Sequence, residues 1–386
     1  MSTLTNLCLN RLDADPYLHR IIPYLTHFTQ DHPGQKLIII SDKELLTKGL
    51  YLSLKENDIP VQLYNQYRPI PLNLLNGTQE EVLHRLQDLE MLQYQDPRSG
   101  TEALLNQTSY LALTHALTII KTVKGNLATL HDLTMFLNSP TYQQNAAHLI
   151  SKFQQMPVSS DWQRQQHLEA MNWFLYDYFP STAKKQTHYQ TFEYAALGRL
   201  KLEQFEQEWL QLFPKQGVEH RIDLLLKPDV VIIDVHHLKQ TKQAVVTYLI
   251  EVLGESNGKN KTIQLFCDLS QPLSDYQWSE ILLNHSFEIT QTRHLPKESL
   301  SIETIYETRS VKFLQYYHIS NKEALVQAIR QFKTPEQLYR EKQRQLETLR
   351  REEVLRTIPK PSARREGFDQ EIVMEEDEMI DFSKIS

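Results

Sequence analysis

Residues 36–76, with the sequence KLIIISDKELLTKGLYLSLKENDIPVQLYNQYRPIPLNLLN, decide the fold class of this chain. The apolar run from Leu37 to Ile40 is too short for a helix and rich in β-branched residues, so it predicts a strand buried on both faces. A helical pattern from Glu44 to Asn57 follows, and Val61 to Tyr64 predicts a second strand before a proline-containing turn. Strand, helix and strand form a βαβ unit, whose right-handed crossover is typical of a mostly parallel sheet.

Composition excludes several classes of protein. The chain has 386 residues, of which 40% are hydrophobic, enough for two domains or for one domain with a large insertion. Its formal net charge of -7 does not favour nucleic acid as a partner. Cys8 and Cys267 both lie in apolar runs, which is typical of reduced core thiols in a cytosolic protein. Neither a signal-peptide pattern nor a run of about 18 apolar residues is present, so we expect a cytoplasmic protein that reaches a membrane only through a partner.

The N-terminal segment has the context of a P-loop without its chemistry. Thr5 to Leu9 predicts a strand, and a helical pattern follows from Tyr17 to Thr29. The loop between them contains no glycine and no lysine, whereas a phosphate-binding loop needs both. Asp13 and Asp15 would also repel a triphosphate, so we expect no ATP binding at this loop. The glycines near residue 256 follow a predicted helix and precede a strand, which is the reverse of the P-loop order.

The rest of the chain predicts a long helical stretch and then a return to strands. Residues 78–212 carry helical patterns, and Val230 to Val235 is the strongest strand signal. The other expected strands are Thr262 to Cys267 before Asp268, Phe287 to Thr290 ending at Gln291, and an edge strand from Lys312 to Ile319. We therefore expect an α/β fold with a mostly parallel sheet (1–77 and 216–333), an all-α insertion (78–215) and a charged C-terminal region (334–386).

No catalytic or metal motif stands out. The nucleophile-elbow, zinc-protease and paired-cysteine patterns are absent from the sequence. His115 and His131 are single histidines on predicted helices. His236 and His237 are adjacent, so we expect their side chains to point to opposite sides, with no carboxylate or cysteine to complete a site. The sequence thus predicts neither a catalytic residue nor a metal ligand.

The order of these elements resembles the coupling-protein ATPases of type IV secretion and conjugation, the TraG/TraD-like and DotL-like family. In that family a strand ending in Asp-Pro-Lys-Gly, a helix, a strand and an Asn-Pro-Leu turn lead into an all-α domain, which is inserted into a RecA-like motor domain. Ile40-Ser41-Asp42-Lys43-Glu44 resembles the first motif without its proline and glycine, and Pro71-Leu72-Asn73-Leu74 stands at the place of the second. Thr129-Leu130 and Tyr178-Phe179-Pro180 resemble the all-α domain, and Ile222-Asp223-Leu224 resembles the return to the motor domain. The resemblance covers roughly residues 1–320 and lies in the order and spacing of elements.

The departures from this family fall on its catalytic residues. The strand ending in Asp-Glu corresponds to Phe266 to Leu269, so Asp268 takes the place of the Mg²⁺-binding aspartate and leucine replaces the glutamate. Gln291 corresponds to the family's strand-end glutamine. Without the P-loop lysine and the glutamate, the chain lacks the positioning and charge stabilisation that phosphoryl transfer requires. The resemblance therefore implies a pseudo-ATPase without a cofactor, in which Asp268 and Gln291 are vestiges of a nucleotide site.

The C-terminal region predicts a separate attachment segment. Thr334 to Arg356 forms a highly charged helical pattern with a thin apolar stripe, made of Leu338, Tyr339, Leu346 and Leu349. The residues after it are polar, predict disorder and contain an acidic cluster with Glu375, Glu376 and Glu378. Because coupling proteins of this family carry C-terminal extensions that recruit adaptors, the resemblance implies that both features bind a protein partner. A solubilising acidic tail is the alternative.

These observations give one functional hypothesis and three alternatives. The hypothesis is a non-catalytic structural or recruiting subunit that binds an active coupling ATPase or secretion adaptors, at the inner face of the membrane. The first alternative is a translocated substrate that carries its signal in the acidic tail. The second is a nucleotide hydrolase with an unrecognised site. The third, a nucleic-acid-binding module, predicts salt-sensitive binding and is disfavoured by the acidic balance.

Overall fold

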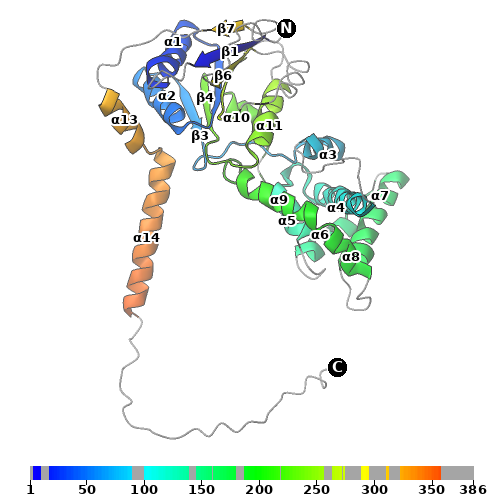
Figure 1. Ribbon diagram of the computed structural model, residues 1–386. Coiled ribbons are helices and arrows are strands. Elements are labelled where there is room, and N and C mark those ends of the chain that lie inside the picture. Colours follow the sequence, from blue (N-terminus) through cyan, green and yellow to red (C-terminus); the bar gives the residue numbers. More distant parts are fainter. Residues whose placement is uncertain are drawn as a thin grey trace, which may run out of the picture. The chain divides into compact units, whose positions relative to one another are not determined.

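A computed structural model describes residues 3–9, 17–88, 100–138, 145–158, 160–179, 187–217, 219–255, 263–271, 273, 288–294, 310–312 and 322–357. Contacts divide the chain into two units, Met1–Lys333 and Thr334–Ser386. The first unit is an α/β structure built on a parallel sheet, with strand order β3-β4-β2-β5-β6-β1-β7 (Figure 1). The strands are β1 (Thr3–Leu9), β2 (Lys36–Ser41), β3 (Val61–Tyr64), β4 (Val230–Asp234), β5 (Ile263–Asp268), β6 (Glu288–His294) and β7 (Ser310–Lys312).

The predicted α/β class and the parallel sheet are confirmed. Every hydrogen-bonded strand pair in the described residues is parallel. β2 lies between β4 and β5, and all six of its residues are buried, as the apolar run predicted. β6 continues to His294, so the expectation that this strand ends at Gln291 was wrong. Of the expected edge strand, Lys312 ends β7, and residues 313–319 lie outside the described residues.

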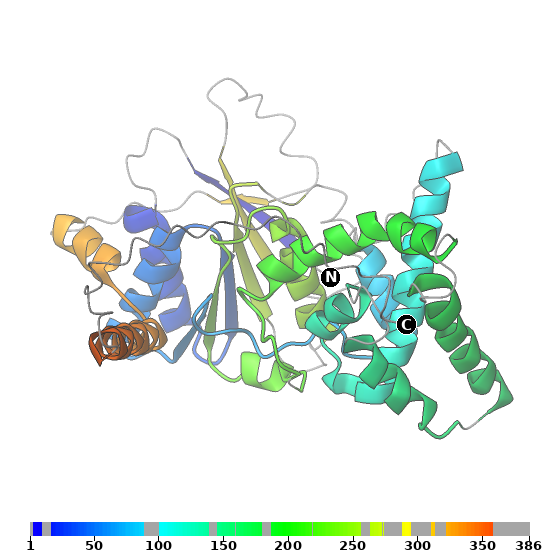
Figure 2. The ribbon, with the colours of Figure 1, turned by 90° about the horizontal axis from the view of Figure 1, so that it is seen from below.

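Alternate residues of β2 enter different cores. Leu37 and Ile39 pack with η1 (Tyr17–Ile21), α1 (Ile22–Asp31) and α2 (Glu44–Glu56) on one face of the sheet. Ile38 and Ile40 belong to the other core, which includes α11 (Lys242–Glu255) and the helices between β3 and β4. Figure 2 shows α1 and α2 in blue on one side of the sheet and α11 in green on the other. A strand covered on both faces explains the absence of polar residues from Leu37 to Ile40.

The described residues between β3 and β4 form helices and no strands. These helices are α3 (Gln79–Asp88), α4 (Gly100–Lys124), η2 (Gly125–Leu127), α5 (Leu130–Leu137), α6 (Asn145–Gln154), α7 (Asp161–Asn172), η3 (Trp173–Tyr178), α8 (Thr187–Tyr194), α9 (Ala196–Trp209) and α10 (Ile222–Leu225). A capping box starts α5, because Thr129 and Asp132 bond each other's backbone N–H groups. The Asn73 side chain connects this region to the segment after β3 by donating to the carbonyls of Asn126 and Ala128 at 2.9 and 2.8 Å.

Among the described residues, two further helices follow the sheet. α13 (Lys322–Gln331) belongs to the first unit, where Ile329 packs in the same core as α1 and α2. α14 (Pro335–Thr357) belongs to the second unit and closely matches the predicted charged helix. None of the described helices combines the length and apolar character needed to cross a membrane.

The buried faces of the sheet make a direct prediction about stability. Leu265 in β5 is 1% exposed, so Leu265→Ala should lower the free energy of unfolding by about 2–5 kcal/mol through lost burial and a cavity. Leu168 in α7 is 48% exposed, and Leu168→Ala should change it by about 0.5 kcal/mol or less. Urea unfolding followed by circular dichroism measures both, and equal effects of the two substitutions would contradict the assigned burial.

Candidate functional site

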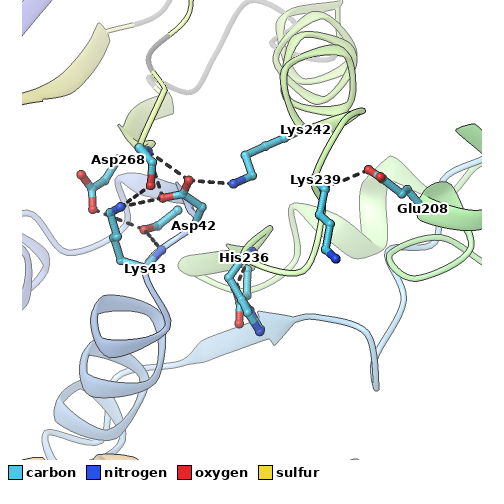
Figure 3. Close-up of polar contacts among 10 residues, drawn as sticks. Asp42, Lys43, Glu208, His236, Lys239, Lys242 and Asp268 are labelled. Atoms are coloured by element: carbon cyan, nitrogen blue, oxygen red, sulfur yellow. Dashed lines mark hydrogen bonds and ion pairs between the residues drawn. The ribbon is translucent and has the colours of Figure 1, made fainter.

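Three neighbouring strands end in polar residues at one edge of the sheet. Ser41 ends β2 and is paired with Asp234 at the end of β4 and with Asp268 at the end of β5. Ligands of α/β proteins bind at the carboxyl ends of parallel strands, so this edge is the candidate site. We call it the carboxyl edge and define it as Ser41–Lys43, Asp234–His237 and Asp268–Ser270. Figure 3 shows its polar contacts.

The Asp42 carboxylate is at the centre of the carboxyl edge. Its side chain is 1% exposed, and its Oδ2 atom lies 2.8 Å from Nζ of Lys242, the first residue of α11 (Figure 3). The backbone N–H of Ser270 donates to both carboxylate oxygens at 3.0 Å, and Nζ of Lys43 lies 3.4 Å from Oδ1. Burial raises the pKa of Asp42, but the hydrogen bonds from Lys242 and Ser270 outweigh it and hold this pKa below its usual range. Asp42 is therefore a buried carboxylate whose charge is compensated within the chain.

Asp268 is completely buried. The Ser41 hydroxyl donates to its Oδ2 atom at 3.4 Å, and the Tyr17 hydroxyl forms a second side-chain hydrogen bond. Burial raises the pKa of Tyr17, and the nearby Asp268 carboxylate raises it further, so the phenol stays protonated and donates. Tyr17 is the first residue of the π-helix that precedes α1. Its hydrogen bond to Asp268 connects this helix to the end of β5.

The two predicted vestiges of a nucleotide site lie on neighbouring strands. Gln291 of β6 is paired with Cys267, which precedes Asp268 in β5. Gln291 is an internal residue of its strand, whereas Asp268 ends β5. The structure therefore brings the two positions close together but gives only Asp268 a place at the carboxyl edge.

A carboxylate that the sequence did not reveal binds the start of α11. Glu208 of α9 accepts hydrogen bonds from the backbone N–H groups of Lys239, Gln240 and Thr241 at 3.0, 3.1 and 3.0 Å, and from the Thr241 hydroxyl at 2.7 Å. Burial raises the pKa of Glu208, but the bonds from Thr241 and its neighbours outweigh it and lower the pKa. Glu208 thus binds the backbone that leads into α11 and links the helical region to the segment between β4 and α11 (Figure 3).

Asp234, His236 and His237 form a compact cluster beside this network. One ligand atom from each residue lies within 4.8 Å of the others. His236 donates to Oδ1 of Asp234 through its backbone N–H at 3.1 Å and pairs with it through Nδ1 at 2.7 Å. The hydrogen bond to Asp234 raises the pKa of His236, whereas burial lowers the pKa of His237 to about 4.

The expectation that the two histidines lack a neighbouring carboxylate was wrong. It assumed that strand geometry continues through His236 and His237, where successive side chains alternate. β4 ends at Asp234, and the next residues form a turn closed by the N–H of Leu238 to the carbonyl of Val235 at 3.1 Å. In a turn the two rings need not lie on opposite faces, and their centroids lie 5.4 Å apart.

The predicted partner-binding residues belong to the second unit. The side chains of the stripe on α14 are exposed by 45% for Leu338, 64% for Tyr339, 49% for Leu346 and 59% for Leu349. Glu375, Glu376 and Glu378 lie outside the described residues. The apolar stripe is therefore present as a surface feature of α14.

Comparison with known proteins adds no relative. No protein-family model matches the chain, and no curated protein matches its sequence.

The Glu208 contact yields a prediction with a pH signature. Glu208→Gln should lower the free energy of unfolding by about 1–3 kcal/mol, because an amide cannot replace a charged acceptor of four hydrogen bonds. Since the pKa of Glu208 is lowered by folding, its contribution is present above the unfolded pKa of about 4.5 and is lost as the pH falls through the folded value. The difference between wild type and variant should therefore be constant above the unfolded pKa and shrink as the pH falls below it.

Glu203, exposed on the same helix, provides the control for this measurement. Glu203→Gln should change stability by about 0.5 kcal/mol or less at every pH. Urea titrations across the pH range measure all three proteins. A Glu208→Gln effect that equals the control, or that does not change with pH, would contradict the stabilising role of these hydrogen bonds.

Proposed function

We propose that this chain is a non-catalytic, RecA-like subunit that binds a coupling ATPase or its adaptors in a type IV secretion or conjugation system. In this proposal the helices between β3 and β4 correspond to the all-α insertion of that family. The sheet and the helices form an inert body, and the second unit supplies an attachment to the partner. The partner then brings the chain to the inner face of the membrane.

The strand order supports a RecA-like arrangement. In such a domain the strand before the P-loop and the strand ending in the Mg²⁺-binding aspartate are separated by one strand. Here β6 lies between β1, which precedes the glycine-free loop, and β5, which ends at Asp268. The parallel register of β1, β6 and β5 places their carboxyl ends at the same edge.

The environment of Asp268 is the main support for the proposal that the chain is not catalytic. A carboxylate that binds Mg²⁺ with a nucleotide must face the solvent-filled site, because magnesium keeps several of its waters. Asp268 is 0% exposed and is hydrogen-bonded by Ser41 and Tyr17. The next residue, Leu269, is 4% exposed and offers no base for an attacking water.

Lys43 of the carboxyl edge and the neighbouring Lys242 are both paired with a carboxylate of the chain. Nζ of Lys242 is paired with Asp42 at 2.8 Å, and Nζ of Lys43 lies near Asp42 and bonds the hydroxyl of Ser270. A triphosphate would have to displace these internal contacts before it gained any charge stabilisation. The arrangement therefore supports a structural role for residues that a motor domain would use on its substrate.

The stripe on α14 supports the attachment. Tyr339, Leu346 and Leu349 are spaced by seven and three residues, so they lie on one helix face, with Leu338 at its border. Each of these side chains is at least 45% exposed, on a helix whose other positions are mostly charged or polar. An amphipathic helix of this kind binds a groove on a partner through its apolar face.

Site-specific photocrosslinking tests this proposal in the native cell. A photoreactive phenylalanine analogue at Tyr339 should crosslink to the coupling ATPase or to a secretion adaptor. The same analogue at Arg344, an exposed position on the opposite face of α14, should give little product. Mass spectrometry of the affinity-purified adducts identifies the partner and the crosslinked position.

Three outcomes would contradict the proposal. They are equal yields from the two positions, adducts without any secretion component, and export of the chain itself by the secretion system. The last result would identify the chain as a translocated substrate.

A further inference from the structure

The cluster of Asp234, His236 and His237 has the composition of a transition-metal site. Two imidazoles and one carboxylate form the donor set of many catalytic zinc and non-haem iron sites. The three ligand atoms lie within 4.8 Å of one another. Their positions are fixed by the end of β4, because Asp234 is paired with Ser41 of the central strand β2.

His237 is the feature that points to a missing ligand. Both of its ring nitrogens are buried, and neither has a hydrogen-bond partner within the described part of the chain. Buried polar atoms are normally satisfied, so a pair of unsatisfied nitrogens on one ring requires an explanation. A bound metal ion would account for one of the two nitrogens, because it accepts the lone pair of an imidazole nitrogen directly.

The lysines near the cluster are paired with other carboxylates, so the negative charge of Asp234 is available to a bound cation. The nearby Lys242 is paired with Asp42 at 2.8 Å, and Lys48 is paired with Glu44 at 2.5 Å. The Asp234 side chain is 3% exposed and has only a histidine as its ion-pair partner in the described residues. Asp234 is thus a buried carboxylate without a lysine or arginine to neutralise it.

We propose that Asp234, His236 and His237 bind a divalent first-row transition metal ion, with Zn²⁺ as the first candidate. Imidazole ligands favour zinc and its neighbours over Mg²⁺ and Ca²⁺, which prefer oxygen. Three protein ligands leave a coordination position for water. This site is independent of the proposed function, since neither the secretion partner nor the nucleotide argument depends on it.

Binding requires only small movements of the side chains. Zinc–ligand bonds of about 2.0–2.1 Å in a tetrahedron place ligand atoms about 3.3 Å apart. The 2.7 Å contact between Nδ1 of His236 and Oδ1 of Asp234 must therefore open slightly. His236 must carry its proton on Nε2, so that Nδ1 can bind the metal, and its side chain is 34% exposed, which gives the ion access.

Zinc titration of the full chain tests the site directly. The protein carries a tag without histidines, is stripped with a chelator and is then titrated with Zn²⁺ against a chromophoric chelator. We expect one tightly bound ion per chain and a higher thermal unfolding midpoint with zinc than without it. His237→Gln should weaken binding by at least about tenfold and abolish the thermal shift.

Two further variants make the result decisive. His236→Gln should weaken binding in the same way and covers the case in which His237→Gln does not fold. His148→Gln, which changes an exposed histidine on α6, should bind zinc like the wild type. The proposal is overturned if wild type binds no zinc with a Kd below about 10 µM, or if both cluster variants retain wild-type binding.

Discussion

The buried carboxylate of Asp42 connects segments that lie far apart in the sequence. Its partners are Lys242, 200 residues away, and the backbone of Ser270, 228 residues away. These contacts tie the end of β2 to the start of α11 and to the segment after β5. Because the side chain is 1% exposed, its charge depends on these partners, and loss of either would leave a buried ion that is less well compensated. The packing of the central strands is therefore linked to this single charge.

Other polar groups at the carboxyl edge and beside it are also paired within the chain. Glu208 of the chain itself accepts hydrogen bonds from the backbone N–H groups of Lys239, Gln240 and Thr241, just before α11. Asp268, at a position that could hold a cation, is covered by Tyr17 and Ser41. Under the proposed function, internal groups thus take the places that a nucleotide and its metal would occupy in a working motor domain. An edge of this kind fits a subunit that acts through its surfaces.

The strands and helices were largely predictable because they depend on local patterns. The run from Leu37 to Ile40 identified a strand covered on both faces, and the charged pattern from Thr334 to Arg356 identified α14. The ends of elements were harder to predict. β6 continues beyond Gln291, and no residue in its sequence marks where it ends.

The contacts of the carboxyl edge could not be predicted in the same way. Glu208 looks like any charged residue on a helix, and its bonds to Lys239–Thr241 depend on how α9 is placed against α11. The cluster at His236 was missed for a different reason, because the turn after Asp234 changes the direction of both rings. Pairing across 200 residues, as between Asp42 and Lys242, requires the sheet order, which a single sequence does not give.

Equilibrium binding of Mg²⁺–ATP tests the central claim that the carboxyl edge is closed to nucleotides. Isothermal titration of the full chain should show no saturable binding up to about 1 mM nucleotide, which corresponds to a binding free energy weaker than about -4 kcal/mol. Saturable binding of one nucleotide per chain, lost in the Asp268→Asn variant, would contradict the account and show a working nucleotide site.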